Sequence, residues 1–130
     1  MNSTITLVGN LTREPELRHT PNGSVLANFG LAVNRRWRAG EDWQEQTSFF
    51  NVVAWRELGE NVAASLRRGD LVVVHGRLEQ RSWTTDGGER RSTVEVVADD
   101  VGPSLRWATA EISRRHRNGA DDEAALRSAA

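Results

Sequence analysis

The sequence LVVVHGRLEQRSWTTDGGERRSTVEVVA, which occupies residues 71–98, predicts two β-strands joined by a tight turn. Small or apolar residues recur on one face of its first half, at Val72, Val74, Gly76 and Leu78. The TTDGG stretch at 84–88 is typical of a hairpin turn, because glycine tolerates the positive φ angles that such turns need. The chain returns as a strand over 90–98, where we expect Val94 and Val96 to face the core.

One helix and three further strands are predicted before residue 71. Leu58, Val62 and Leu66 recur every four residues within 57–68, which indicates a helix, and Gly69 follows as a typical helix-ending residue. The three strands alternate apolar with polar residues or are rich in aromatic and β-branched ones, and they cover 4–8, a long stretch that begins at Val25 and runs past Val33 to Trp37, and 49–55. The core face of the second of these strands is predicted to carry Val25, Ala27, Phe29, Leu31 and Val33.

The order of these elements predicts the fold. Three strands, a helix and two more strands are the element order of the oligonucleotide/oligosaccharide-binding (OB) barrel, a closed five-stranded fold. We therefore expect a mainly β protein with one short helix between the third and fourth barrel strands.

Length and composition bound what such a barrel can do. A chain of 130 residues supports one domain with a short extension. It contains no cysteine, which excludes a disulfide scaffold, a thiol nucleophile and a thiolate zinc site. No apolar run approaches the length of a membrane span, and the first residues lack the pattern of a secretory signal. We expect a cytoplasmic, nucleoid-associated protein.

Charge is distributed unevenly along the chain. The net charge of −1 argues at first against a nucleic-acid ligand. Residues 1–98 hold 12 Arg and 12 acidic residues, whereas 118–130 hold one Arg and three acidic residues. We therefore divide the chain into an OB-fold domain at 1–98, an extension at 99–117 and a flexible tail at 118–130.

The strand faces suggest a ligand with flat apolar surfaces. The predicted strand 49–55 is apolar on both faces, although a small barrel has only one interior. The second face could meet another subunit or the unpaired bases of a nucleic acid. Four of the five Trp residues lie within two positions of an Arg, namely Trp37, Trp55, Trp83 and Trp107. Aromatic rings beside guanidinium groups suit single strands, whose bases stack while cations hold the phosphates.

The strand face on which each aromatic residue lies indicates whether it is expected to contact a ligand. Trp55 and Trp83 lie on faces that the core does not use, so we expect base stacking there. Trp37 shares its parity with the core residues but lies at the far end of a long strand. Trp43 fits the cover of a hairpin better than a ligand contact, and Phe50 fits core or subunit packing better than DNA.

Phosphate contacts are expected from arginines near the stacking positions. These are Arg35, Arg36, Arg56, Arg77 and Arg81.

Signals for catalysis or metal binding are poor. His19, His75 and His116 are not spaced as a set of metal ligands, and no glycine-rich phosphate loop is present. Adjacent acids such as Asp99 and Asp100 would point to opposite faces of a strand. We expect no catalytic residues, no metal site and no cofactor.

Several motifs in this order resemble those of bacterial single-stranded-DNA-binding proteins. The resemblance extends from about Ser3 to Ala98 and is carried by VGNL at 8–11, EPELR at 14–18, PNG at 21–23, ANF at 27–29, EQT at 45–47, GD at 69–70, GRL at 76–78 and RSW at 81–83. It implies a homotetrameric OB barrel that binds single-stranded DNA without strong sequence preference. It also implies stacking by Trp37, Phe49, Trp55 and Trp83, and a subunit contact at Phe50.

The segment VGPSLRWATA at 101–110 further resembles the actinobacterial branch of that family. There the segment forms a strand that clamps neighbouring subunits, which would make Leu105 and Trp107 oligomer contacts. Alternation over 105–112 fits that strand, although Leu105, Ala108 and Ile112 would also share a helical face.

The last residues depart from the usual family pattern. The sequence ends LRSAA, without the acidic run and Pro-Phe dipeptide of members that recruit replication and repair enzymes. It resembles the shorter paralogue of some actinobacteria, so recruitment through such a tip is not implied.

Two rival hypotheses belong to other classes. A barrel that had lost DNA binding would use its second apolar face to meet a protein partner. A nuclease would need a metal-dependent site, for which the sequence gives little support. The expected function is single-stranded DNA binding in replication, repair, recombination or DNA uptake.

Overall fold

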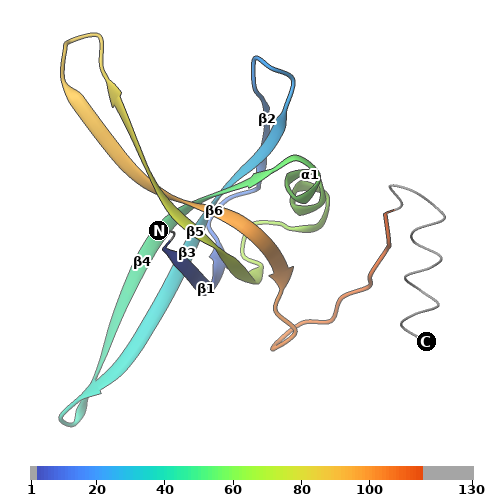
Figure 1. The fold of residues 1–130 in the computed structure, drawn as a ribbon. Helices are drawn as coiled ribbons and strands as arrows, with labels where there is room; N and C mark the ends of the chain where they lie inside the picture. The colour runs from blue at the N-terminus through green and yellow to red at the C-terminus, as the bar shows by residue number, and fades with distance from the viewer. Residues whose placement is uncertain (1–2, 116–130) are drawn as a thin grey trace.

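The computed structural model describes residues 3–115, which form six strands and one helix (Figure 1). In chain order the elements are β1 (Thr4–Leu11), β2 (Glu16–His19), β3 (Val25–Ala39), β4 (Asp42–Trp55), α1 (Arg56–Ser65), β5 (Leu71–Thr84) and β6 (Arg90–Pro103).

Five of the strands close into a barrel. The strand order is β1-β5-β6-β4-β3, and β1 pairs again with β3 through Asn10↔Ala32 and Leu11↔Leu31. All pairs are antiparallel except β4–β6, which is parallel. The short strand β2 adds to the outer edge of β3. The prediction of a five-stranded OB barrel is confirmed, and α1 lies between its third and fourth strands, β4 and β5.

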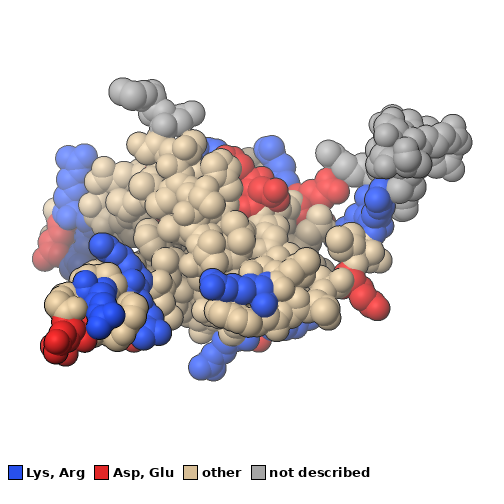
Figure 2. Space-filling view, turned by 90° about the horizontal axis from the view of Figure 1, so that it is seen from below, with Lys and Arg blue, Asp and Glu red and all other residues tan. Residues whose placement is uncertain are grey.

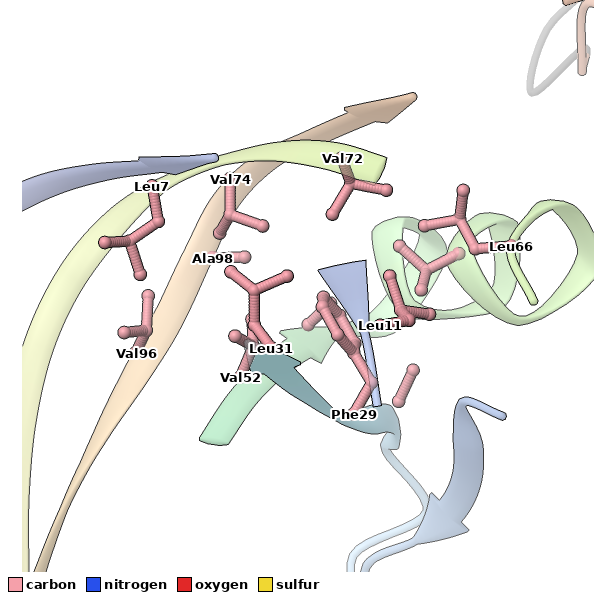
Figure 3. Packing of buried hydrophobic residues seen from close by; sticks show 13 residues of the cluster. Leu7, Leu11, Phe29, Leu31, Val52, Leu66, Val72, Val74, Val96 and Ala98 are labelled. Carbon is pink, nitrogen blue, oxygen red and sulfur yellow. The ribbon is translucent and has the colours of Figure 1, made fainter. Parts of the chain in front are cut away.

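The core fills the barrel and includes Phe29, Leu31, Val72, Val74 and Val96, which alternation in the sequence predicted (Figure 3). Its largest fully buried side chains are Phe29, Leu31, Val52, Val72, Val74 and Val96. Val25 and Val33 are only partly buried, and two other expected core residues are exposed: Val94 by 55% and Leu78 by 37%. Val94 and Leu78 both lie toward the turn of the β5–β6 hairpin, where the strands extend past the barrel and have no opposite wall.

Two hairpins project from the barrel in different directions (Figure 1). In the β3–β4 hairpin, strand pairing continues as far as Ala39↔Asp42, so β3 ends close to the predicted Trp37 and β4 begins well before the predicted start at residue 49. Residues 34–48 are mostly polar on both faces, so they carry no apolar alternation that would mark them as strands. Strand β6 also continues past the predicted limit at Ala98 and ends at Pro103.

Helix α1 packs its apolar side against one end of the barrel, where Val62 and Leu66 join the core. The contact is close at Gly59, because a Cβ there would lie 2.3 Å from the carbonyl oxygen of Ala54. Gly69, which follows the helix, has a φ of +91°, a conformation that glycine adopts without steric cost.

Residues 104–115 leave the barrel without regular structure. Leu105–Ile112 forms neither the expected strand nor the alternative helix within a single chain, and pairing as a clamp would require a second copy. Leu105 and Trp107 are 66% and 76% exposed. The tail expected at 118–130 lies outside the described residues, as does His116.

Candidate nucleic-acid interface

One face of the sheet points away from the core and carries most of the aromatic side chains expected to bind DNA. Ala27, Phe29 and Leu31 are fully buried, so the residues that alternate with them on β3 lie outside the barrel. The same holds for Phe49, Asn51, Val53 and Trp55 of β4, which pair with those outer residues. On β5 the outward positions are Val73, His75, Arg77, Glu79, Arg81 and Trp83. We call this surface of β3, β4, β6 and β5 the outer sheet face.

Three of the four predicted stacking residues share the outer sheet face. Phe49 is 73% exposed, Trp55 is 40% exposed and Trp83 is 42% exposed. None of the three contributes to the core cluster. These large rings are therefore solvent-exposed at positions where packing within the barrel does not use them.

Trp37 lies on the opposite face of the β3–β4 hairpin. It pairs with Gln44 and has the parity of the buried residue Phe29. Because it lies beyond the barrel, it is still 37% exposed. The structure therefore does not place the four predicted stacking residues on one common face.

Trp43 lies on the outward parity of β4, in step with Phe49 and Trp55. It is 62% exposed, and the guanidinium carbons of Arg36 and Arg38 lie 5.3 and 5.9 Å from its ring centroid. Trp43 therefore lies near the end of the hairpin, as expected, with its ring exposed beside two cations. Positions 43, 49 and 55 are evenly spaced along one face of β4.

Arginine–tryptophan contacts recur at two of the predicted stacking positions. The guanidinium carbon of Arg35 lies 5.0 Å from the Trp37 ring centroid, and that of Arg81 lies 5.6 Å from the Trp83 centroid. Such contacts hold a cation beside an aromatic face. They place a cationic group beside a partly exposed aromatic ring at both positions.

The predicted phosphate-contact arginines differ in whether an acid already pairs with them. Within residues 3–115, Arg35, Arg36, Arg56 and Arg81 have no carboxylate oxygen within 4.0 Å. Arg77, in contrast, pairs with Glu79 at 3.5 Å and with Asp99 at 3.6 Å. Four of the five are therefore available to an anionic ligand, and the fifth is partly neutralised.

Arg56 adopts an unusual backbone conformation directly after Trp55. Its φ of 56° lies in the left-handed region, which is costly for a residue with a Cβ. The sharp turn lets β4 end at the outward-facing Trp55 and α1 begin at the next residue. A shallow depression beside it is lined by Asn22, Ser24, Trp55, Arg56, Arg77, Val97 and Ala98.

No continuous basic patch is present on the face shown in Figure 2. Side chains of both charges are dispersed around a broad area of uncharged residues. Long-range attraction of an anionic ligand by this face alone would therefore be weak.

The three residues expected at subunit contacts lie in two different settings. Phe50 has core parity, is partly buried and packs against the core cluster. Leu105 and Trp107 lie in the irregular segment after β6 and are exposed.

Residues 3–115 contain neither a cluster of metal-ligating side chains nor a membrane-spanning helix. No three His, Asp or Glu side chains in that range are grouped so as to hold a metal ion. No helix in the same range is long and apolar enough to span a membrane.

Comparison with known proteins assigns the family. A model described as the single-strand binding protein family matches residues 1–104. The single-stranded DNA-binding protein of Mycolicibacterium smegmatis is 50% identical over 120 residues, which cover 90% of this chain and 73% of the relative. That of Mycobacterium tuberculosis is 49% identical, with the same coverage.

A solved structure agrees with this assignment. The small single-stranded DNA-binding protein of Streptomyces coelicolor superposes with a TM-score of 0.67 at 35% identity, covering 81% of this chain and 96% of that one. The resemblance predicted from the sequence motifs is confirmed, as is the expectation of a non-enzymatic family. The chain belongs to the single-strand binding protein family.

Proposed function

We propose that the protein binds single-stranded DNA without sequence preference, by stacking bases on exposed aromatic rings and holding phosphates with arginines. The observation that carries this proposal is the presence of Phe49, Trp55 and Trp83 on one outward face of the sheet, exposed and unused by the core. The names of the relatives, all single-stranded DNA-binding proteins, support the same ligand.

Stacking accounts for the preference for single strands. A base in a duplex already stacks on its neighbours, whereas an unpaired base has a free face for an aromatic ring. Each stacked base is worth about 1–3 kcal/mol whatever its identity, because every base has a π-face. Trp43 extends this set, since it lies on the same outward face with two arginines beside its ring.

Arginine contacts supply the second part of the affinity. Arg35, Arg36, Arg56 and Arg81 have no carboxylate partner in the described part of the chain, so phosphates need not displace one. Arg77 would have to share its charge between a phosphate and two acids. Phosphate binding releases counterions from the DNA, so affinity should fall as salt rises.

A titration of Trp fluorescence with oligo(dT) at several NaCl concentrations tests the proposal. We expect strong quenching by oligo(dT), little change with duplex DNA of the same length, and a linear fall of log affinity with log salt. A folded protein whose fluorescence does not respond to oligo(dT) at low salt would refute the proposal. If the outer sheet face served a protein partner instead, this absence of quenching is the expected result.

We further propose that the barrels assemble as a homotetramer. Residues 99–117 would act as an extension whose segment around Leu105 and Trp107 clamps a neighbouring subunit. Exposed apolar side chains in that segment support the idea, because an isolated chain leaves them in water. The exposed part of Phe50 would contribute at the barrel.

Sedimentation equilibrium of the double variant Leu105→Ser/Trp107→Ser tests the clamp. We expect the association equilibrium to shift toward smaller species, with an unchanged circular dichroism spectrum. The matched control is Val94→Ser, which removes an exposed apolar group from the β5–β6 hairpin instead. Association equal to that of the wild type in the double variant would exclude the clamp.

The cellular setting we propose is single-stranded DNA exposed in replication, repair, recombination or uptake, in the cytoplasm.

A further inference from the structure

Arg13 lies outside every Arg–Trp pair in the sequence, yet its guanidinium reaches the outer sheet face. The residue follows β1, and its Nη2 donates hydrogen bonds to Oδ1 of Asn28 at 2.7 Å and Oδ1 of Asn51 at 3.4 Å. Asn28 belongs to β3 and Asn51 to β4, so the guanidinium bridges two neighbouring strands.

A glycine makes room for this side chain on β3. A Cβ at Gly30 would lie 2.6 Å from Nη1 of Arg13 and 2.2 Å from Oγ1 of Thr12. Such a Cβ would require the Arg13 guanidinium and the Thr12 hydroxyl to shift from these positions. Gly30 pairs directly with Asn51. The residue that leaves room for the Arg13 side chain and the residue that accepts its hydrogen bond are therefore opposite one another on β3 and β4.

Arg13 contacts β4 at a point between two of the predicted stacking residues. Asn51 lies between Phe49 and Trp55 on the outward parity of the strand. The two residues are six positions apart, which corresponds to about 20 Å of extended strand. A single strand that stacks bases on both rings would pass its backbone over the Asn51 region.

The guanidinium also keeps hydrogen-bonding capacity. Arginine has five N–H donors, and the hydrogen bonds of Arg13 to the described residues use only Nη2. Within residues 3–115 no carboxylate oxygen lies within 4.0 Å of it. Asn51 is itself held from the other side, because its Nδ2 donates to Oε2 of Glu95 at 3.4 Å.

We propose that Arg13 binds a phosphate of single-stranded DNA between the bases stacked on Phe49 and Trp55, positioned by Asn28 and Asn51. This inference rests on the proposed DNA-binding function and adds a contact that neither the sequence pattern nor the family assignment supplies. The competing role is purely structural, in which Arg13 only ties the segment after β1 to the sheet.

Three variants of the full chain separate these roles. Arg13→Ala removes the charge, Arg13→Gln removes it while keeping a hydrogen-bonding side chain, and Asn28→Ala leaves the charge but removes its nearer acceptor. Arg18→Ala is the matched control, since Arg18 lies on the adjacent strand β2 and is already paired with Glu16 at 3.3 Å. Affinity for oligo(dT) is measured by Trp quenching at four NaCl concentrations, and folding by thermal melting.

We expect Arg13→Ala and Arg13→Gln to weaken binding roughly three- to tenfold at low salt. The slope of log affinity against log salt should become shallower by about 0.7 in both, the value for one lost phosphate contact on a single strand. Asn28→Ala should weaken binding less and keep the wild-type slope. Arg18→Ala should match the wild type in affinity and in slope.

Two results would overturn the inference while leaving the proposed function intact. One is wild-type affinity and slope in both Arg13 variants. The other is weaker binding with an unchanged slope and a lowered melting temperature, which is the signature of the structural role. If the wild-type protein itself shows no quenching, the proposed function fails and this inference fails with it.

Discussion

The Nε of Arg77 lies 3.5 Å from Oε1 of Glu79, two residues further along β5 on the same outward face. Glu79 therefore partly neutralises the charge of Arg77, an arginine that was expected to bind phosphate. It also pairs across the ladder with Glu95, which places two like charges opposite one another. Like charges in such a cross-strand pair destabilise a sheet, so this arrangement has no evident structural benefit.

Replacing Glu79 with Gln should therefore tighten DNA binding. The variant removes one of the two acids that pair with Arg77, leaving Asp99, and removes a negative charge from the outer sheet face. Exposed charge pairs are worth about 0.2–1 kcal/mol, so we expect a gain in affinity of roughly 1.5- to 5-fold at low salt. The gain should shrink as NaCl is raised, because salt screens exposed charges.

Glu16→Gln is the control for this substitution. Glu16 pairs with Arg18 on β2 and is similarly exposed, but it lies on a strand that carries none of the predicted stacking residues. Affinity for oligo(dT) should remain at the wild-type value. Equal tightening in both variants would indicate a general charge effect rather than a role for Arg77.

Much of the barrel could be predicted because burial imposes a period on the sequence. Phe29, Leu31, Val72 and Val74 occupy the interior as their alternation indicated. The same logic failed beyond the barrel. Residues 42–48 pair with β3 as a regular strand although neither of their faces is buried, so backbone hydrogen bonds form there without an apolar signal. Val94 was misassigned for the related reason that alternation continues past the end of the core.

Prediction of the site had a different limit. Parity correctly indicated that Trp55 and Trp83 lie away from the core, since a strand has only two faces. Arg13 could not be found in this way. Its position depends on a long side chain that crosses to strands 15 and 38 residues away in sequence, and on the absence of a side chain at Gly30.

Phe29 and Phe49 provide a test that separates stability from binding. Phe29 is fully buried, so Phe29→Ala should lower the free energy of unfolding by about 3–5 kcal/mol. Phe49 is 73% exposed, so Phe49→Ala should change that free energy by less than about 0.5 kcal/mol. Urea denaturation followed by circular dichroism measures both.

In DNA binding the larger effect should come from Phe49→Ala, and Phe29→Ala should have the smaller one. Phe49→Ala should weaken oligo(dT) binding by about 1–3 kcal/mol, the usual value of one stacked base. The folded fraction of Phe29→Ala should bind as the wild type does. Wild-type affinity in Phe49→Ala would remove this residue from the proposed site.

The backbone at Arg56 predicts a difference between two substitutions that both remove its charge. With φ at 56°, any side chain with a Cβ costs roughly 1–2 kcal/mol, whereas glycine does not. Glycine costs about 0.5–1 kcal/mol of its own through the greater entropy of the unfolded chain. Arg56→Gly should therefore be at least as stable as Arg56→Ala in urea denaturation.

Their DNA affinities should fall equally, because both lose the same cation. Each should also show a salt dependence shallower by about 0.7 than that of the wild type. A lower stability of the glycine variant would show that the left-handed conformation at this residue is not strained. Unequal affinities would indicate that the turn itself, rather than the charge, positions Trp55.

Trp43→Ala tests whether the stacking surface extends to the tip of the β3–β4 hairpin. The ring is 62% exposed and lies on the outward parity of Phe49 and Trp55, so its loss should leave folding intact. If a base stacks there, affinity for a long oligo(dT) should fall by about 1–3 kcal/mol. A short oligonucleotide that cannot reach the tip should bind as tightly as it binds the wild type.

Trp107→Ala is the matched control for that variant. Trp107 is 76% exposed and has Arg106 4.8 Å from its ring centroid, so it shares the local chemistry of Trp43 but lies after the last barrel strand. Its loss should leave the affinity for both oligonucleotides unchanged at protein concentrations where the subunits stay associated. Equal losses in the two variants would mean that an Arg–Trp pair is sufficient for binding wherever it lies, and that the outer sheet face has no special role. A loss in Trp43→Ala alone, confined to the long oligonucleotide, would place the path of the DNA along β4 from Trp55 to the hairpin tip.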